Sequence, residues 1–273
     1  MDRPAWLMDL DLASMRTLSR MWRTGIQIAC FSFFAIGGIG VSTLCVLYRL
    51  LWPGSVQKKQ RHARKMVNFF FRGLLGTLRV TGCMQLVVHD VAQLATLRQS
   101  LVLANHPSYL DVVVLLALMP EANCLVKGAL WKNPFFWGIV RATGYVQNTS
   151  PEQALDACAE AISAGDALIL FPEGTRTVPG ESMKFQRGAA HVALRATARV
   201  VPVLLHCTPP TLTKGASWWL APTQPFVFTV RVLAQTDVSQ LIGEVANPSI
   251  GARKLSEALH ALFQSRLTEY GYA

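Results

Sequence analysis

The run Leu101-Val102-Leu103-Ala104 is followed directly by Asn105-His106-Pro107-Ser108-Tyr109-Leu110-Asp111, so that an apolar segment passes into a polar one. The run Ala167-Leu168-Ile169-Leu170 passes in the same way into Phe171-Pro172-Glu173-Gly174-Thr175-Arg176. Short apolar runs of this kind predict buried β-strands, and α/β proteins keep their chemistry at the ends of such strands. The two stretches together therefore predict an α/β fold with one site after its strands.

The rest of the chain after Gly82 agrees with this fold, because short β-like runs alternate with segments of helical periodicity. Strands are expected at residues 84–89, 101–104, 124–126, 144–147, 167–171, 200–206 and 226–233. Helices are expected at residues 109–118, 134–141, 151–164, 188–198 and 252–270. The pattern predicts an α/β sandwich in which helices cover the sheet.

The first polar stretch contains a possible general base. His106 stands between the expected strand and the expected helix, and Asp111 follows about one and a half helical turns later. A carboxylate on one imidazole nitrogen fixes the tautomer and makes the other nitrogen more basic toward an alcohol. Because no serine belongs to this pair, we expect the activated hydroxyl to come from a substrate.

The second polar stretch suits an anion. Glu173 and Arg176 bracket Gly174, and a guanidinium beside exposed backbone is a good partner for phosphate. A Glu–Arg pair that merely stabilises a tight turn explains this stretch equally well when it is taken alone.

Taken together, the blocks at 105–111 and 171–176, with Lys184-Phe185-Gln186-Arg187-Gly188 and Val201-Pro202-Val203 after them, resemble the glycerophospholipid acyltransferase family. That family is typified by the 1-acylglycerol-3-phosphate acyltransferases, and the resemblance covers about residues 83 to 210. It implies an acyltransferase-type αβα sandwich with a mixed, mostly parallel sheet.

The resemblance also implies an activity and roles for individual residues. A fatty acyl group would move from acyl-CoA or acyl carrier protein to the free hydroxyl of a lysophospholipid, most simply 1-acyl-sn-glycerol-3-phosphate, which would give phosphatidic acid. His106 and Asp111 would be catalytic, and the acceptor's polar head would be bound by Glu173, Gly174, Thr175 and Arg176. No metal and no cofactor besides the acyl-donor co-substrate is expected, and backbone N–H groups at residues 107–109 are candidates to stabilise the oxyanion.

The chain departs from the family where a strand usually ends in an Asp-Arg or similar pair, because Gln147 and Asn148 stand there. Lys127 or Lys184 would then join Arg176 in binding the acceptor's phosphate. Alternatively, the same chemistry would serve a specialised lipid acceptor with acyl carrier protein as donor. A non-catalytic membrane protein that binds lipid is an alternative from another class.

The first 82 residues predict a membrane anchor, with the acyltransferase domain at residues 83–273. No charged residue occurs from Thr24 to Tyr48, a length that spans the hydrocarbon of a bilayer as a transmembrane helix of about residues 24–48. A buried core helix, or a hairpin that enters and leaves by the same leaflet, would give the same pattern. The run is too long, and starts too deep in the chain, for a signal peptide.

Basic residues surround this run. Residues 1–82 contain 12 of the 26 Lys and Arg but only 3 of the 16 Asp and Glu. A basic amphipathic helix is expected at about residues 56–79, with Phe69-Phe70-Phe71 dipping into the bilayer and the cations on its anionic surface. A nucleic-acid partner is not expected beside a segment of bilayer length. Six scattered cysteines and the basic cluster after the run favour the cytoplasmic side of the inner membrane for the catalytic part.

Overall fold

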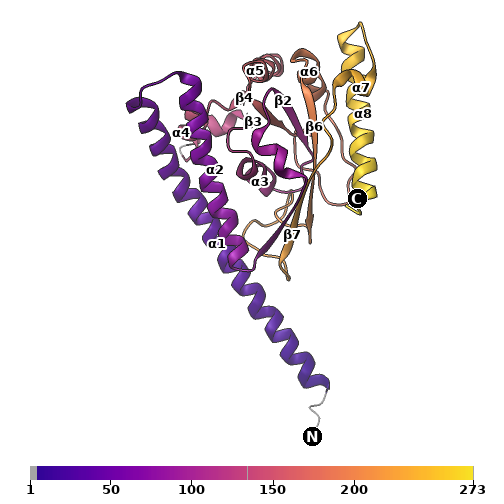
Figure 1. The fold of residues 1–273 in the computed structure, drawn as a ribbon. Helices are drawn as coiled ribbons and strands as arrows, with labels where there is room; N and C mark the ends of the chain where they lie inside the picture. Colours follow the sequence, from indigo (N-terminus) through magenta and orange to yellow (C-terminus); the bar gives the residue numbers. More distant parts are fainter. Residues whose placement is uncertain (1–4, 134, 273) are drawn as a thin grey trace.

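The structure of the protein is a computed structural model that describes residues 5–133 and 135–272. In these residues one sheet of seven strands lies between two layers of helices (Figure 1). The strands follow one another across the sheet in the order β1-β7-β6-β2-β5-β3-β4. Each neighbouring pair is parallel except β6 with β7, so the predicted αβα sandwich with a mixed, mostly parallel sheet is confirmed.

All seven strands lie where the apolar runs predict them. They are β1 (Met84–His89), β2 (Ser100–Ala104), β3 (Asn123–Lys127), β4 (Val146–Asn148), β5 (Ala167–Leu170), β6 (Arg199–Thr208) and β7 (Phe226–Val232). The central strand β2 is buried along its whole length, because its side chains alternate between the two helical layers. Val102 and Ala104 face one layer, whereas Leu101 and Leu103 face the other.

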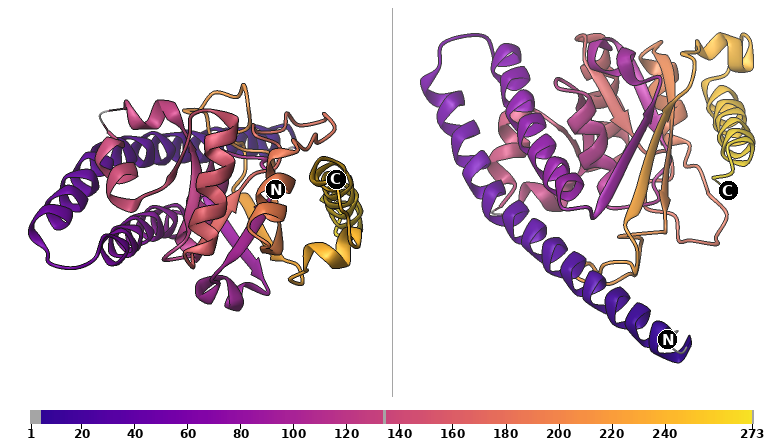
Figure 2. Two further views of the ribbon diagram at one scale, coloured as in Figure 1. Left: turned by 90° about the horizontal axis from the view of Figure 1, so that it is seen from above. Right: turned by 60° about the horizontal axis from the view of Figure 1, so that its bottom comes forward.

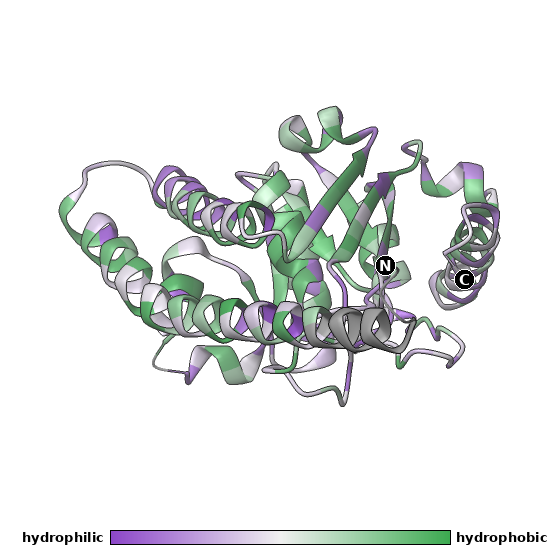
Figure 3. Cartoon of the chain, turned by 90° about the horizontal axis from the view of Figure 1, so that it is seen from below, coloured by the Kyte–Doolittle hydropathy of each residue, from purple (hydrophilic) through white to green (hydrophobic). Residues whose placement is uncertain are grey.

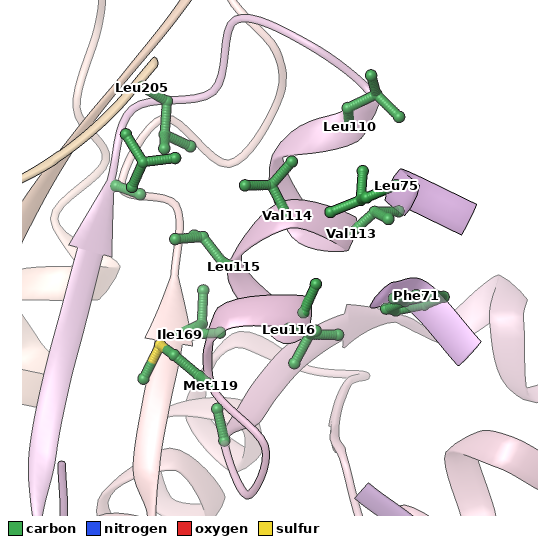
Figure 4. Close-up of a cluster of buried hydrophobic side chains, with 14 of the residues drawn as sticks. Phe71, Leu75, Leu110, Val113, Val114, Leu115, Leu116, Met119, Ile169 and Leu205 are labelled. Carbon is green, nitrogen blue, oxygen red and sulfur yellow. The ribbon is translucent and has the colours of Figure 1, made fainter. Parts of the chain in front are cut away.

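One face of the sheet is covered by the N-terminal half of the chain. Its helices are α1 (Ala5–Leu51), α2 (Val56–Val80), α3 (Leu110–Leu118) and α4 (Trp137–Thr143), with the short 3₁₀ helices η1 (Val91–Thr96) and η2 (Gly128–Trp131) beside them. Their core is mainly apolar, as Figure 4 shows for α2, α3 and the strands beneath them. Helix α3 is the centre of this core, since most of its side chains are buried.

The other face of the sheet is covered by α5 (Pro151–Ser163), α6 (Gly188–Arg195), α7 (Val238–Ile242) and α8 (Pro248–Glu269). The sequence did not predict α7, which is short and depends on a capping box between Asp237 and Gln240. Helix α8 starts at Pro248, earlier than expected, because the Asn247 side chain accepts hydrogen bonds from the first turn. The expected helix at 134–141 is found as α4, and Pro134 lies outside the described residues.

Helices α1 and α2 form a hairpin that lies along one side of the sandwich, opposite α8 (Figures 1 and 2). Helix α1 is 47 residues long, nearly twice as long as the helix predicted over residues 24–48. Residues 1–4 of the predicted anchor lie outside the described residues. Within the described part of the chain, it is the single helix whose segment, Thr17–Leu51, has the length and composition to cross a membrane. Figure 3 shows hydrophobic residues along most of α1.

Polar side chains fasten α1 to the rest of the molecule along its length. Arg23 is 5% exposed and donates to the carbonyl of Pro222 at 3.2 Å, and Gln27 donates to the carbonyl of Trp218. Farther along, Ser42 donates to the Phe135 carbonyl at 3.0 Å. The helix thus packs on the domain over several turns, while its N-terminal end extends beyond the sandwich (Figure 1).

Helix α2 corrects one prediction. Its apolar stripe was expected to enter the bilayer, but Val67, Phe71, Leu74 and Leu78 are buried in the protein core. Phe70 packs on the Phe33 and Phe34 rings of α1, with ring centroids 5.4 and 6.1 Å apart. Only Phe69 of the three phenylalanines is strongly exposed, at 81%. A stripe that can enter lipid can equally cover a sheet, and sequence periodicity does not distinguish the two.

Candidate active site

The two polar stretches meet at one edge of the sheet. Strands β2 and β5 are parallel neighbours with Leu103 beside Leu170, so the residues that follow them leave the sheet side by side. The backbone of His106 is held directly by the second stretch: its N–H donates to Glu173 Oε1 at 2.7 Å, and its carbonyl accepts from the Thr177 N–H at 3.1 Å. The strand order thereby brings together residues that lie sixty positions apart in the chain.

The predicted contact between His106 and Asp111 is confirmed. Nδ1 of His106 lies 2.7 Å from Oδ2 of Asp111, which also accepts from the Ser108 N–H at 2.8 Å. The imidazole stacks on the Phe171 ring, with centroids 4.2 Å apart and planes inclined by 24°. Within the described part of the chain, Nε2 of His106 has no hydrogen-bond partner, and the side chain is 17% exposed. One nitrogen is thus held by Asp111, and the other is left without a partner among the described residues.

Asp111 is fully buried, and its Oδ1 has no hydrogen-bond partner among the described residues. Burial raises the pKa of this carboxyl to about 6, although the hydrogen bond from His106 acts in the opposite direction. The carboxylate form is still favoured at neutral pH. A buried carboxylate on Nδ1 makes Nε2 a better proton acceptor.

Glu173 is placed differently from the other residues predicted to bind substrate. It is 5% exposed, and its Oε2 accepts a hydrogen bond from the Thr177 hydroxyl while Oε1 accepts from His106. Burial raises the pKa of the Glu173 carboxyl. Both oxygens are therefore occupied within the protein, in positions that hold the His106 loop.

The rest of the second stretch is accessible. Gly174 has a φ of +68°, a conformation that favours glycine, and this turn leaves Gly174 and Thr175 exposed. The guanidinium carbon of Arg176 lies 3.3 Å from the centroid of the Tyr109 ring, and Nη1 is 3.4 Å from the Leu212 carbonyl. Arg176 is thereby held beside Tyr109, the residue just before α3 and three positions after His106.

The two predicted lysines lie in different places, and both are exposed. Lys127 ends β3, the neighbour of β5, and is therefore at the same edge of the sheet as the two polar stretches. Lys184 lies in the loop before α6. The structure thus puts Lys127 after a neighbouring strand of the same sheet, but Lys184 in a separate loop.

The predicted oxyanion donors are corrected by the structure. The Ser108 N–H donates to Asp111, and the Tyr109 N–H donates to the Leu212 carbonyl at 3.0 Å. Position 107 is proline and has no N–H. These groups are occupied because the turn before α3 needs them to hold Asp111 and the 211–212 loop in place.

A polar cavity of about 970 Å³ opens on one side of His106. It extends from residues 105–107 to the C-terminal half of α8, and residues 177–183 form another wall. His206 lines it and stacks on the Tyr272 ring with centroids 4.6 Å apart. Burial lowers the pKa of His206, which favours its neutral form.

A second cavity, of about 410 Å³, begins at Tyr109 and Leu110 and runs between α3 and the helical hairpin. Its lining is nearly all apolar, with residues such as Phe31, Phe71 and Ile139. The turn from His106 to Leu110 lies between the polar and the apolar cavity. Both volumes are within the usual range of ligand cavities, about 300–1,000 Å³.

Three residues of the site had no predicted role. Asn105 joins β2 to β6 by two hydrogen bonds to the backbone of Leu205, at 2.8 and 2.7 Å. Phe171 supports the imidazole, and Thr177 contacts both Glu173 and the His106 carbonyl. Asn105 and Phe171 lie within the two polar stretches, so their position in the sequence could have indicated a role in the site. Thr177 follows the second stretch, and nothing in the sequence indicates its role.

Comparisons with known proteins give a consistent result. A family model described as "Acyltransferase" matches residues 85–206. A 1-acyl-sn-glycerol-3-phosphate acyltransferase of Chlamydomonas reinhardtii is 26% identical over 154 residues, which cover 55% of this chain and 46% of that protein. One of Helicobacter pylori is 31% identical over 112 residues, 38% of this chain and 47% of that protein. This chain therefore spans about half the length of the curated relatives it matches.

A solved structure resembles the whole fold. The crystal structure of a 1-acyl-sn-glycerophosphate acyltransferase, PlsC, from Thermotoga maritima superposes with a TM-score of 0.66. The match covers 92% of this chain and 97% of that one at 19% sequence identity. At this identity the likeness shows a shared fold, which includes the helices before the sandwich.

Proposed function

We propose that the chain is a membrane-bound O-acyltransferase of the glycerophospholipid acyltransferase family, because an "Acyltransferase" family model matches residues 85–206 and 1-acyl-sn-glycerol-3-phosphate acyltransferases are among the relatives it resembles. It moves a fatty acyl group from a thioester donor, acyl-CoA or acyl carrier protein, to the free hydroxyl of a lysophospholipid. The proposed acceptor is 1-acyl-sn-glycerol-3-phosphate, and the product is phosphatidic acid. The observation that carries the proposal is His106, whose Nδ1 is held by buried Asp111 and which lines a cavity.

The proposed mechanism needs no covalent acyl-enzyme. Nε2 of His106 takes the proton of the acceptor hydroxyl as its oxygen bonds to the thioester carbonyl carbon. The C–S bond then breaks, the ester is formed, and the proton passes from His106 to the departing sulfur, which leaves as a thiol. Asp111 keeps the imidazole in the required tautomer and stabilises its protonated form.

Arg176 is proposed to bind the acceptor's phosphate. The guanidinium stacks on Tyr109 close to His106, and most of its N–H groups have no partner among the described residues. A planar guanidinium in this setting suits two phosphate oxygens at once. Lys127, at the end of the neighbouring strand β3, is the proposed second cation, with exposed Gly174 and Thr175 beside Arg176.

The apolar cavity supports a fatty acyl substrate. It starts at Tyr109, next to the reacting centre, and its wall includes helices α1 and α2 of the proposed anchor. A hydrocarbon chain in this cavity would be removed from water by side chains that make no demand for hydrogen bonds. We place the acyl chain there, with its carbonyl end at His106.

Residues 1–82 are proposed to anchor the enzyme to the cytoplasmic side of the inner membrane, without crossing it. The exposed side of α1 is rich in large apolar residues, among them Leu18, Trp22, Phe33, Ile36, Leu44 and Leu50. Its other side is fastened to the domain through Arg23, Gln27 and Ser42. These contacts favour a helix that lies in one leaflet, with exposed cations of α2 on the anionic surface.

A specialised acceptor, with acyl carrier protein as donor, is the second candidate. Gln147 and Asn148 are neutral where the resemblance leads us to expect a charged pair, and Asn148 lies beside Lys127 in the β3–β4 register. Gln147 lines a third cavity of about 450 Å³ and is not among the lining residues of the two cavities at His106. This placement favours the simpler acceptor.

Transfer of labelled palmitate from palmitoyl-CoA to a panel of lysophospholipids by the full chain in detergent tests the proposal. We expect labelled phosphatidic acid from lysophosphatidic acid, and a loss of at least about 10²-fold in kcat for His106→Ala. His191→Ala is the matched control, since this histidine lies on α6 outside the site. Wild-type protein that is folded but transfers palmitate to no acceptor from either donor class would contradict the proposed function.

A further inference from the structure

The polar cavity beside His106 has a composition that differs from the rest of the site. None of its lining residues, all of them described, is lysine or arginine, whereas Glu173 and Glu181 are both among them. Its lining includes six neutral hydrogen-bonding side chains: Thr177, Ser182, Thr213, Gln264, Ser265 and Thr268. The second histidine, His206, adds no positive charge at neutral pH because burial lowers its pKa. Such a wall disfavours a phosphate and suits an uncharged polar chain.

The cation proposed for the acceptor lies on the other side of the His106 loop. Arg176 rests on Tyr109 and contacts the Leu212 carbonyl, and both of these residues line the apolar cavity. The phosphate and the hydrocarbon of the substrates are thus provided for on the side of the helical hairpin. Neither group needs the polar cavity, which is therefore available to another part of a substrate.

The polar cavity also leads away from the hairpin. It connects His106 with the C-terminal half of α8, and Figures 1 and 2 show α8 on the side of the sandwich opposite α1 and α2. A water-soluble donor can approach from this side while a lipid remains in the bilayer. Two exposed cations flank the rim, because Lys184 follows the lining residue Met183 and Lys214 follows the lining residue Thr213.

We infer that the polar cavity holds the pantetheine arm of the thioester donor. The arm is an uncharged chain with two amide groups, and it ends in a phosphate in both coenzyme A and acyl carrier protein. Its sulfur would lie at His106, its amides along the neutral wall of residues 177–182 and α8, and its phosphate outside the cavity near Lys184 and Lys214. Lys184, which the resemblance suggested for the acceptor, thereby serves the donor. This inference rests on the proposed function.

Ser265→Trp tests the inference, because Ser265 is exposed on α8 and a bulky side chain there would narrow the cavity. The donors are palmitoyl-CoA, palmitoyl–acyl carrier protein and S-palmitoyl-N-acetylcysteamine, which has only the thiol end of the arm. We expect the KM for the two full-length donors to rise about tenfold or more, with the KM for lysophosphatidic acid and for the short thioester within about twofold. Ala261→Trp, one turn earlier on α8 and outside the lining, is the matched control.

A second variant, Lys184→Ala/Lys214→Ala, changes only exposed side chains and does not depend on how an indole introduced on α8 packs. Its KM should rise for both donors that carry the phosphate and stay unchanged for the short thioester. A comparison of the wild-type kcat/KM for palmitoyl-CoA and for palmitoyl–acyl carrier protein shows which of the two supplies the arm, because the preferred donor has the higher value.

Two results would overturn the inference while the proposed function stands: an active Ser265→Trp enzyme whose donor KM matches that of Ala261→Trp, or a rise in the KM for lysophosphatidic acid instead. The second result would place the acceptor's head in this cavity. Absence of transfer by the wild-type enzyme from every donor would instead remove the proposed function itself.

Discussion

At the scale of single residues, the site depends on a carboxylate that has no access to water. Asp111 makes two hydrogen bonds through Oδ2, to His106 and to the Ser108 N–H, and none through Oδ1 among the described residues. We expect Asp111→Asn to lower kcat by about 10²–10⁴-fold, since the amide cannot hold the imidazole in the required tautomer. Steady-state kinetics with lysophosphatidic acid measure the effect, and an unchanged kcat would remove Asp111 from the mechanism.

The same substitution should change how stability depends on pH. Because burial raises the pKa of Asp111 from its ordinary value of 3.8 to about 6, the folded protein binds a proton more tightly than the unfolded chain does. Wild-type stability should therefore fall as pH rises from about 4 to about 6. The fall should be smaller in Asp111→Asn, with a remainder from Glu173, whose pKa is also raised. Melting temperatures of both proteins in detergent, measured from about pH 4 to about pH 6, test this prediction. If the melting temperature changes with pH equally in the two proteins, the Asp111 carboxyl is not coupled to folding.

Glu173 is a positioning residue by its contacts, which include the backbone of His106 and the hydroxyl of Thr177. Glu173→Ala would leave two partly buried donors without acceptors, at a cost of up to about 1–3 kcal/mol each in the free energy of unfolding. We expect a lower melting temperature and a lower kcat, with the KM for lysophosphatidic acid within about twofold. Glu173→Gln, which retains an acceptor for the His106 N–H, should recover much of both. A large rise in KM for the acceptor would support direct binding instead.

At the scale of elements, the packing of α1 on α4 depends on a close approach. A Cβ added to Gly138 of α4 would lie 2.8 Å from the carbonyl oxygen of Ser42 on α1, and backbone cannot move aside as a side chain can. Gly138→Ala should therefore lower the free energy of unfolding by about 1–3 kcal/mol. Gly40→Ala on α1 is the control, because nothing lies within 4 Å of its added Cβ. Similar melting temperatures for the two variants in detergent would disprove this close contact.

At the scale of the whole molecule, the hairpin determines how the enzyme would meet a bilayer. A helix that crosses the membrane would put residues 17 and 57 on opposite sides, whereas a hairpin in one leaflet keeps both on the side of the catalytic domain. The six native cysteines are buried, and positions 17 and 57 are exposed and polar, so Thr17→Cys and Gln57→Cys each give one accessible thiol. In sealed vesicles, we expect a membrane-impermeant maleimide to label both variants from the same side. Labelling from opposite sides would favour a spanning helix, and the wild-type chain controls for background.

The sequence could predict most of the sheet and the main contact of the site. All seven strands were predicted because each is a short apolar run bounded by polar or turn residues, and His106 and Asp111 lie close enough in the chain for local geometry to bring them together. The short helix α7 and the early start of α8 were missed, since they depend on single capping side chains.

The sequence by itself determined the α/β class and the partnership of His106 with Asp111, and its resemblance to a known family indicated the αβα sandwich. The class follows from periodicity, and the partnership follows from a separation of about one and a half helical turns. Only the tertiary structure decided which face of α2 is buried, that Glu173 holds the His106 backbone, and that two cavities of opposite character meet at the same turn. Those features arise when strands β2, β5 and β6 become neighbours and when the hairpin packs on α3 and α4. Residue spacing along the chain carries no information about such long-range packing.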